Sequence, residues 1–124
     1  MTFYRCSHCG NIITYVTDKG VPVSCCGEPM QELVPGSTDA AQEKHVPVIT
    51  VGDGQVSVSV GTAAHPMTAE HSIQWIALET DRGVSLRMLE PDQPPEAVFP
   101  LLPGEQVRAA YAYCNLHGLW KKDL

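Results

Sequence analysis

The 124-residue sequence has no apolar run long enough to cross a membrane, and no charged-then-apolar leader opens it. It also lacks an excess of positive charge, because 14 acidic and 8 basic side chains give a formal net charge of −6. These absences argue against a membrane protein and against one that binds nucleic acid over a broad surface. We therefore expect a cytoplasmic protein with neither a membrane nor a nucleic acid as partner.

No segment shows a sustained helical period, and there is no internal repeat or low-complexity tract. Prolines at positions 91, 94, 95, 100 and 103 argue against long helices there. The pattern from about residue 45 is that of β-strands instead: Val56, Val58 and Val60 alternate with serines, and similar runs recur at 73–77, 84–88 and 107–113. On this pattern Ile73, Trp75 and Ala77 share one face with His71. Short strands separated by turn signals, such as Gly52-Asp53-Gly54, predict a β-sandwich.

The N-terminal part of the chain has a different character and predicts a separate domain. Residues 11–16 are rich in β-branched and aromatic residues and predict a strand, and residues 18–20 are a turn signal. The polar linker at 35–39 places a boundary that divides the chain into residues 1–36 and 37–124. A domain of under 40 residues buries little surface, so a structural metal is a common remedy.

Four of the five cysteines lie within the first 26 residues, where Cys6 and Cys9 form a C-x-x-C and Cys25 and Cys26 are adjacent. Four thiolates can close a tetrahedral shell around zinc or iron. Neighbouring side chains of an extended segment point to opposite sides, so the adjacent pair needs a local twist to reach one ion. A zinc that merely staples the small domain is an alternative at this stage. Disulfides are less favoured, because cytoplasmic thiols stay reduced and five cysteines do not all pair.

The fifth cysteine belongs to a second group of soft ligands, in the expected sandwich. We expect His8, between the first two cysteines, to be exposed, and we give it no role. The other four histidines and Cys114 together exceed what a tetrahedral zinc site needs: His45, His65, His71 and His117. Five ligands on a metal that prefers octahedral geometry leave one position for a small molecule. Met67 and Met88 are more simply core or loop residues.

Five segments, in order along essentially the whole chain, make the sequence resemble the desulfoferrodoxin family of two-iron superoxide reductases. They are Cys6-Ser7-His8-Cys9-Gly10-Asn11-Ile12, Cys25-Cys26-Gly27, Glu43-Lys44-His45-Val46-Pro47-Val48, His65-Pro66-Met67 through His71, and Cys114-Asn115-Leu116-His117-Gly118-Leu119-Trp120. The resemblance implies an all-β protein in which a desulforedoxin-like metal knuckle precedes an immunoglobulin-like β-sandwich.

The resemblance also implies two iron ions per chain. One iron would be bound by the four N-terminal cysteines: Cys6, Cys9, Cys25 and Cys26. The other would take four equatorial imidazoles and an axial thiolate: His45, His65, His71, His117 and Cys114. The family's glutamate that caps the oxidised iron corresponds to Glu43, and its catalytic lysine corresponds to Lys44. The linker from Pro35 to Gln42 is where family members differ.

The activity implied by the resemblance is the one-electron reduction of superoxide to hydrogen peroxide, with electrons from a rubredoxin-like donor. Lys44, with Lys121 and Lys122 at the edge, would form a local positive patch that attracts the anion. The family tends to form homodimers, which exposed edge strands would allow. Two other classes of function stay open: a rubredoxin-like electron carrier, which leaves the histidines unexplained, and a colourless zinc-stapled binding module.

Overall fold

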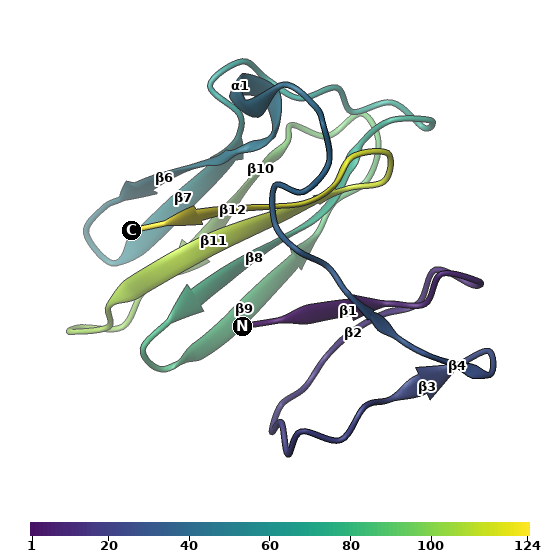
Figure 1. Cartoon of the computed structure of the whole chain (residues 1–124). Helices are drawn as coiled ribbons and strands as arrows, with labels where there is room; N and C mark the ends of the chain where they lie inside the picture. Colours follow the sequence, from purple (N-terminus) through teal and green to yellow (C-terminus); the bar gives the residue numbers. More distant parts are fainter. The chain divides into compact units, whose positions relative to one another are not determined.

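The computed structural model describes residues 1–124, which form two compact units, Met1–Val34 and Pro35–Leu124. Apart from one four-residue helix, all regular elements are β-strands (Figure 1). The predicted all-β class is therefore confirmed. No helix has the length and apolar character needed to span a membrane.

The N-terminal unit consists of a three-stranded sheet and a small hairpin. The sheet has the order β2-β1-β5, and the hairpin pairs β3 with β4. The bounds are β1 Phe3–Arg5, β2 Ile12–Thr14, β3 Ser24–Cys25, β4 Glu28–Pro29 and β5 Gln31–Glu32. The predicted strand at 11–16 corresponds to β2. The loop after β1 and the β3–β4 hairpin carry the cysteines, so the three-stranded sheet supports one half of the cluster and the hairpin supports the other.

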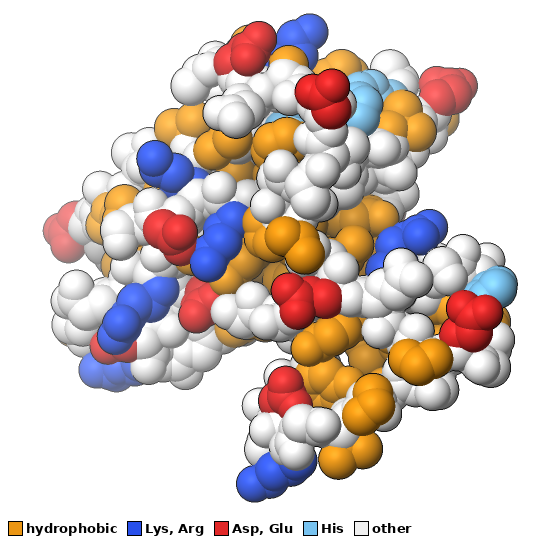
Figure 2. Space-filling model, in the orientation of Figure 1, with side chains coloured by type: hydrophobic (Ala, Val, Ile, Leu, Met, Phe, Trp, Pro, Cys, Tyr) orange, Lys and Arg blue, Asp and Glu red, His pale blue; other side chains and the backbone are white.

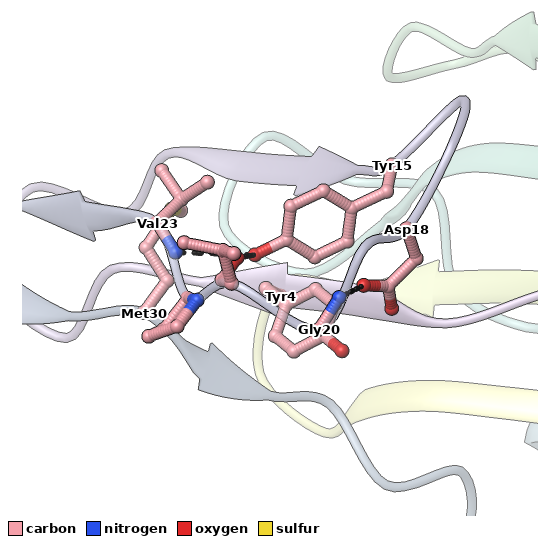
Figure 3. A pocket seen from close by; sticks show the side chains of 8 residues that line it. Tyr4, Tyr15, Asp18, Gly20, Val23 and Met30 are labelled. Carbon is pink, nitrogen blue, oxygen red and sulfur yellow. Dashed lines mark hydrogen bonds between the residues drawn. The ribbon is translucent and has the colours of Figure 1, made fainter.

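The long segment between β2 and β3 is held by contacts among residues that line a pocket of about 180 Å³ (Figure 3). The hydroxyl of Tyr15 accepts a hydrogen bond from the Val23 amide at 3.1 Å and donates one to the Val21 carbonyl at 3.3 Å. The ring of Tyr4 packs edge-on against Tyr15, with 5.2 Å between ring centroids. Asp18 accepts a hydrogen bond from the Gly20 amide, as its turn signal predicted. Tyr15 thus fixes the segment that leads directly into Cys25.

The C-terminal unit is a sandwich of two antiparallel sheets (Figure 1). One sheet has the order β10-β7-β6 and the other β12-β11-β8-β9. The bounds are β6 Pro47–Val51, β7 Gln55–Val60, β8 Ile73–Thr80, β9 Gly83–Met88, β10 Glu96–Pro100, β11 Val107–Cys114 and β12 Gly118–Asp123, with α1 at Gln42–His45 before β6. Seven strands divided into three and four are the arrangement of an immunoglobulin-like sandwich.

The core lies between the two sheets and follows the period of two that the sequence shows. Val56, Val58 and Val60 of β7 are at most 1% exposed, while the serines between them are only half-buried. They pack with residues of the facing sheet: Ile73, Ile76 and Leu78 from β8, and Ala110, Ala112 and Cys114 from β11. One metal-ligand candidate, Cys114, is therefore itself part of the hydrophobic core.

The expectation that Ile73, Trp75 and Ala77 share a face is wrong, because β8 contains a bulge. Trp75 pairs with Tyr113 but Ile73 pairs with Cys114, so Gln74 is left without a partner in the register. The extra residue reverses the direction of the side chains. Ile73 consequently joins the core, whereas Trp75 stacks on Tyr113 with an interplanar angle of 8°. The bulge lies directly beside Cys114.

The strand pairing brings the loops that carry the histidines to one end of the sandwich. Pro47 at the start of β6 pairs with Val60 at the end of β7. Similarly, Cys114 at the end of β11 pairs with Ile73 on β8 and with Gly118 on β12. Antiparallel pairing therefore gathers α1, the β7–β8 connection and the β11–β12 turn at this end. Those three segments carry four histidines, and Cys114 is the last residue of β11 beside them.

Candidate metal centres

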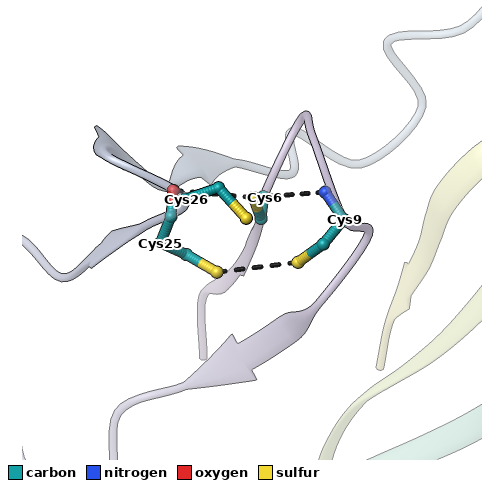
Figure 4. A group of neighbouring side chains, drawn as sticks. All are labelled: Cys6, Cys9, Cys25 and Cys26. Carbon is teal, nitrogen blue, oxygen red and sulfur yellow. Dashed lines mark hydrogen bonds between the residues drawn. The ribbon is translucent and has the colours of Figure 1, made fainter.

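The first two cysteines lie in a tight loop between β1 and β2. The Gly10 amide donates to the Cys6 carbonyl at 3.0 Å, which closes the loop, and Gly10 takes a φ of +83° that suits glycine. The backbone amide of Cys9 lies 3.5 Å from Cys6 Sγ and donates to it. The loop therefore turns both side chains toward the same point and directs an amide at a sulfur (Figure 4).

The adjacent pair Cys25-Cys26 is accommodated by a two-residue hairpin turn. Cys25 pairs with Glu28, so Cys26 and Gly27 form the turn, with φ of +53° and +78°. Two successive positive φ values are the geometry that fits the twist of a tight hairpin. The local twist predicted for this pair is confirmed, and it places a non-glycine residue in the left-handed region at a cost of about 1–2 kcal/mol.

The four sulfurs form one group, the four-cysteine cluster, within 4.8 Å of one another, and no disulfide is present. The hydrogen bond from the Cys9 backbone amide lowers the pKa of Cys6 to about 6. Hydrogen bonding with the neighbouring thiols raises the pKa of Cys26 to about 12. Several thiols this close resist ionising together, and a bound cation removes that repulsion. Cys9 and Cys26 are exposed, so the cluster is open to solvent on one side.

Two further residues support the cluster. His8 is exposed as predicted, and its Nε2 forms an ion pair with Glu28 at 3.1 Å when protonated, which links the two cysteine loops. The Asn11 amide nitrogen lies 3.7 Å from Cys25 Sγ and its backbone amide lies 3.5 Å from Cys9 Sγ. Sequence reasoning gave neither residue a role, since their contacts depend on how the two loops meet.

The second group of ligands, which we name the His/Cys donor set, comprises His45, His65, His71, Cys114 and His117. Nε2 of His45 and Nε2 of His65 lie 3.2 Å apart. Each of these rings also lies 2.7 Å from a backbone carbonyl through Nδ1: His45 with Ala41 and His65 with Pro66. A carbonyl only accepts hydrogen bonds, so both Nδ1 atoms carry a proton. In the neutral ring, each Nε2 atom then carries a lone pair. Two lone pairs facing each other at this distance suit a shared cation.

The remaining members complete the same group. One donor atom from each of His45, His65, His71 and Cys114 lies within 4.8 Å of the others. His71 Nε2 is buried and has no hydrogen-bond partner. Nδ1 of His117 lies 3.1 Å from His45 Nε2 and 3.9 Å from Cys114 Sγ. A buried nitrogen without a partner beside a thiol is the arrangement expected of a metal ligand.

Burial keeps two of these imidazoles, those of His65 and His71, in the form that binds metal. Burial, with smaller contributions from the neighbouring histidines, lowers the pKa of His65 to about 4. Burial likewise lowers the pKa of His71, with contributions from His117, His45 and the charge of Lys44. Both rings are therefore neutral at pH 7 and present lone pairs to a cation.

Glu43 and Lys44 precede His45 on α1, and both are exposed. Histidine side chains reach the surface at the end of the sandwich that carries α1, with acidic side chains nearby (Figure 2). The backbone of Glu43 is fixed, because its carbonyl accepts hydrogen bonds from the Ala63 amide at 2.9 Å and the Thr62 hydroxyl at 3.3 Å. Both side chains are thus exposed to solvent, on a main chain that is anchored at Glu43.

Two residues near this site were given no role in the interpretation of the sequence. Trp120 is buried against His45, with 4.9 Å between ring centroids, and its indole donates to the His117 carbonyl at 3.0 Å. Gly61 has a φ of +73°, and a Cβ there would meet Glu43 O, Ala63 O and Lys44 C well inside van der Waals distance. The position of Gly61 after a β-strand signals only a turn. Its close approach to α1 depends on the fold.

Comparison with known proteins agrees with this two-part arrangement. The family described as Desulfoferrodoxin matches residues 37–123, and the one described as Desulfoferrodoxin, N-terminal domain, matches residues 1–33. The chain belongs to the desulfoferrodoxin family. It is 46% identical to the desulfoferrodoxin of Nitratidesulfovibrio vulgaris over 121 residues, which cover 97% of this chain and 94% of that protein. The desulfoferrodoxin of Clostridium acetobutylicum is 42% identical over 100% of this chain and 97% of its own.

A solved structure supports the same family assignment. The superoxide reductase from Treponema pallidum superposes with a TM-score of 0.83 at 39% identity and covers 98% of both chains. Desulfoferrodoxins have two iron sites, and the chain offers one donor set for each. The fit rests on the clustered thiols in one unit and on the opposed Nε2 atoms and the partnerless His71 Nε2 in the other.

Proposed function

We propose that this desulfoferrodoxin is a superoxide reductase, and that the reaction takes place at the His/Cys donor set. The observation that carries the proposal is the convergence of four imidazoles and one thiol at a partly exposed end of the sandwich. Iron bound there would supply a single electron and a coordination position for a small anion. The reaction is superoxide plus one electron and two protons giving hydrogen peroxide, without the oxidative half that would release oxygen.

Cys114 and the histidines would hold the iron and set its electronic properties. The thiolate of Cys114 carries a negative charge that favours the more highly charged oxidised metal and so makes electron donation easier. His45 and His65 are oriented by their Nδ1 bonds to backbone carbonyls, which also raise their basicity as ligands. Cys114 is fully buried, so the thiolate is shielded from water and from oxidants.

Lys44 and Glu43 would act on the anion and on the oxidised site. The charge of Lys44 is close enough to lower the pKa of His71, so its field reaches the donor set. A positive charge there attracts superoxide to a protein whose net charge of −6 repels it at long range. Glu43 would cap the oxidised iron. Its exposed side chain on an anchored backbone suits a group that approaches and leaves.

The four-cysteine cluster would hold the second iron and accept electrons from a rubredoxin-like donor. Its two exposed cysteines place it where a partner protein can approach. We assign residues 1–36 to a desulforedoxin-like Fe(Cys)4 domain and residues 37–124 to the superoxide reductase domain; the division into two compact units supports two domains, with a boundary two residues earlier, between Val34 and Pro35. A cytoplasmic location and a homodimer are part of the same proposal, supported by the unpaired thiols and by the exposed edge strand β9.

The stoichiometry of the reaction tests this proposal. The protein, loaded with iron and reduced, is mixed with superoxide while hydrogen peroxide and oxygen are measured. A reductase forms one peroxide per superoxide and no oxygen, whereas a dismutase forms one peroxide per two superoxide ions and releases oxygen. An electron carrier or a zinc-stapled module does not accelerate the decay of superoxide. Zinc in both sites of protein from a native source, in place of two irons, would contradict the proposal.

A further inference from the structure

The side chain of Asn115 joins the two loops that carry His71 and Cys114. Its Oδ1 accepts a hydrogen bond from the Ser72 amide at 3.0 Å, and its Nδ2 donates to the Glu70 carbonyl at 2.8 Å. The backbone amide of Asn115 also donates to the Ser72 carbonyl at 3.3 Å. All three partners belong to the residues on either side of His71. The side-chain amide of Asn115 therefore holds the main chain on both sides of His71.

His71 depends on these Asn115 contacts more than His45 and His65 do. His45 and His65 are each held by a hydrogen bond from ring Nδ1 to a backbone carbonyl. His71 makes no such bond, and its Nε2 is buried without a partner. Only its backbone is anchored, by Thr68 on one side and through its neighbours by Asn115 on the other. The direction of the His71 ring is thus determined by where these contacts hold the main chain.

We propose that Asn115 is a positioning residue that fixes His71 relative to Cys114. This inference rests on the proposed function only in that both concern the same metal site. Asn115 follows Cys114 directly, so a shift of the amide moves the thiol and the imidazole relative to each other. Asparagine suits the role because its planar amide offers a donor and an acceptor side by side, which matches the carbonyl and the amide that flank His71. Aspartate lacks the donor, and leucine lacks both.

The test uses Co²⁺ as the probe, with Asn115→Leu and Asn115→Asp compared with the unchanged protein. Outer contacts of this kind typically contribute 10- to 100-fold to metal affinity. We expect both substitutions to weaken Co²⁺ binding at the His/Cys donor set by roughly that factor. Binding at the four-cysteine cluster stays the same, since none of its residues contacts Asn115. The two sites are separated by their absorption, because four thiolates give much stronger cobalt–sulfur bands than one.

A matched control removes a comparable bond at the other end of β8. Asp81 accepts a hydrogen bond from the Gln106 amide at 2.9 Å, and Asp81→Leu should leave both cobalt affinities unchanged. Unchanged affinity in both Asn115 variants would overturn the proposal. So would an equal loss of affinity at both sites, or a similar loss in Asp81→Leu, because these results indicate general destabilisation. If the unchanged protein binds Co²⁺ at the donor set but does not reduce superoxide, the proposed function fails while the role of Asn115 stands.

Discussion

Nε2 of His45 and Nε2 of His65 face each other at 3.2 Å, although both rings use their only proton on a backbone carbonyl. In the neutral forms, this pair is repulsive without a cation between the rings. Both side chains are only 3% exposed, so water does not relieve this repulsion. The protein thus maintains a ligand arrangement that is unfavourable until metal binds, and the free energy of metal binding offsets that cost.

The first prediction concerns the pH dependence of the metal-free protein. The pKa of His65 is about 4 in the fold against an ordinary 6.5, so between these values the unfolded chain binds more protons. The contribution of His65 to stability is present above pH 6.5 and is lost as the pH falls toward 4. Urea unfolding of metal-free protein at pH 7 and pH 5 should show a smaller drop in His65→Gln than in the unchanged chain. Equal drops would show that His65 is not held neutral.

The second prediction concerns Glu43. Glu43→Ala should leave the reaction of the reduced protein with superoxide nearly unchanged, because the carboxylate acts only after oxidation. It should raise the affinity of the oxidised protein for azide or cyanide, since the capping group is gone. Glu70→Ala, an exposed glutamate in the loop before His71, is the control and should leave anion affinity as it is. Equal anion affinities in Glu43→Ala and the unchanged protein would make Glu43 an ordinary surface residue.

The third prediction concerns electrostatic attraction by Lys44. Lys44→Ala should slow the second-order reaction with superoxide roughly tenfold, about 1.4 kcal/mol, and should weaken its dependence on salt. Salt screens charges over about 10 Å at 0.1 M, so removal of the nearest charge removes much of the attraction. Lys121 is the matched control, because its ammonium pairs with Asp123 at 3.1 Å. If Lys121→Ala reduces the rate as much as Lys44→Ala does, general charge and not Lys44 guides the anion.

The fourth prediction concerns Gly61, which lets the turn after β7 approach α1. Gly61→Ala places a methyl group against the Glu43 carbonyl and 2.7 Å from Lys44 C, in a left-handed backbone conformation. The conformation alone costs about 1–2 kcal/mol, and the overlap adds to it. Gly104→Ala separates the two effects, since Gly104 has a φ of +80° but nothing within 4 Å of the added atom. Gly61→Ala should lower the free energy of unfolding by clearly more than Gly104→Ala; equal losses would exclude a steric role.

The sequence contained enough to predict the all-β class and the grouping of soft ligands. Alternation of valine and serine at 56–60 reports burial on one side of a strand, and it is independent of the rest of the fold. Alternation failed on β8, where the bulge at Gln74 depends on how β8 and β11 pair at the site. The adjacent cysteines required a twist, and the structure supplies it as a hairpin turn at Cys26-Gly27.

The contacts that orient the ligands lay beyond sequence reasoning. Asn115 stands within a segment that carries the family resemblance, yet a single sequence does not say that its amide reaches Glu70 and Ser72. The same holds for Trp120, whose ring lies on His45, 75 positions away in the chain. Such contacts join segments that are distant in sequence. They follow only from the strand pairing that brings the loops to one end of the sandwich.

The fifth prediction tests the central claim, that superoxide is reduced at the His/Cys donor set and not at the four-cysteine cluster. The measurement is the second-order rate of superoxide decay after a radiolysis pulse, in the reduced Cys114→Ser protein and, as its matched control, the Cys26→Ser protein. A neutral hydroxyl is a poor substitute for the buried thiolate, so Cys114→Ser should lose the reaction while its fold persists. Cys26→Ser damages the other centre and should keep most of the rate. Near-normal decay with Cys114→Ser, or complete loss with Cys26→Ser alone, would contradict the account.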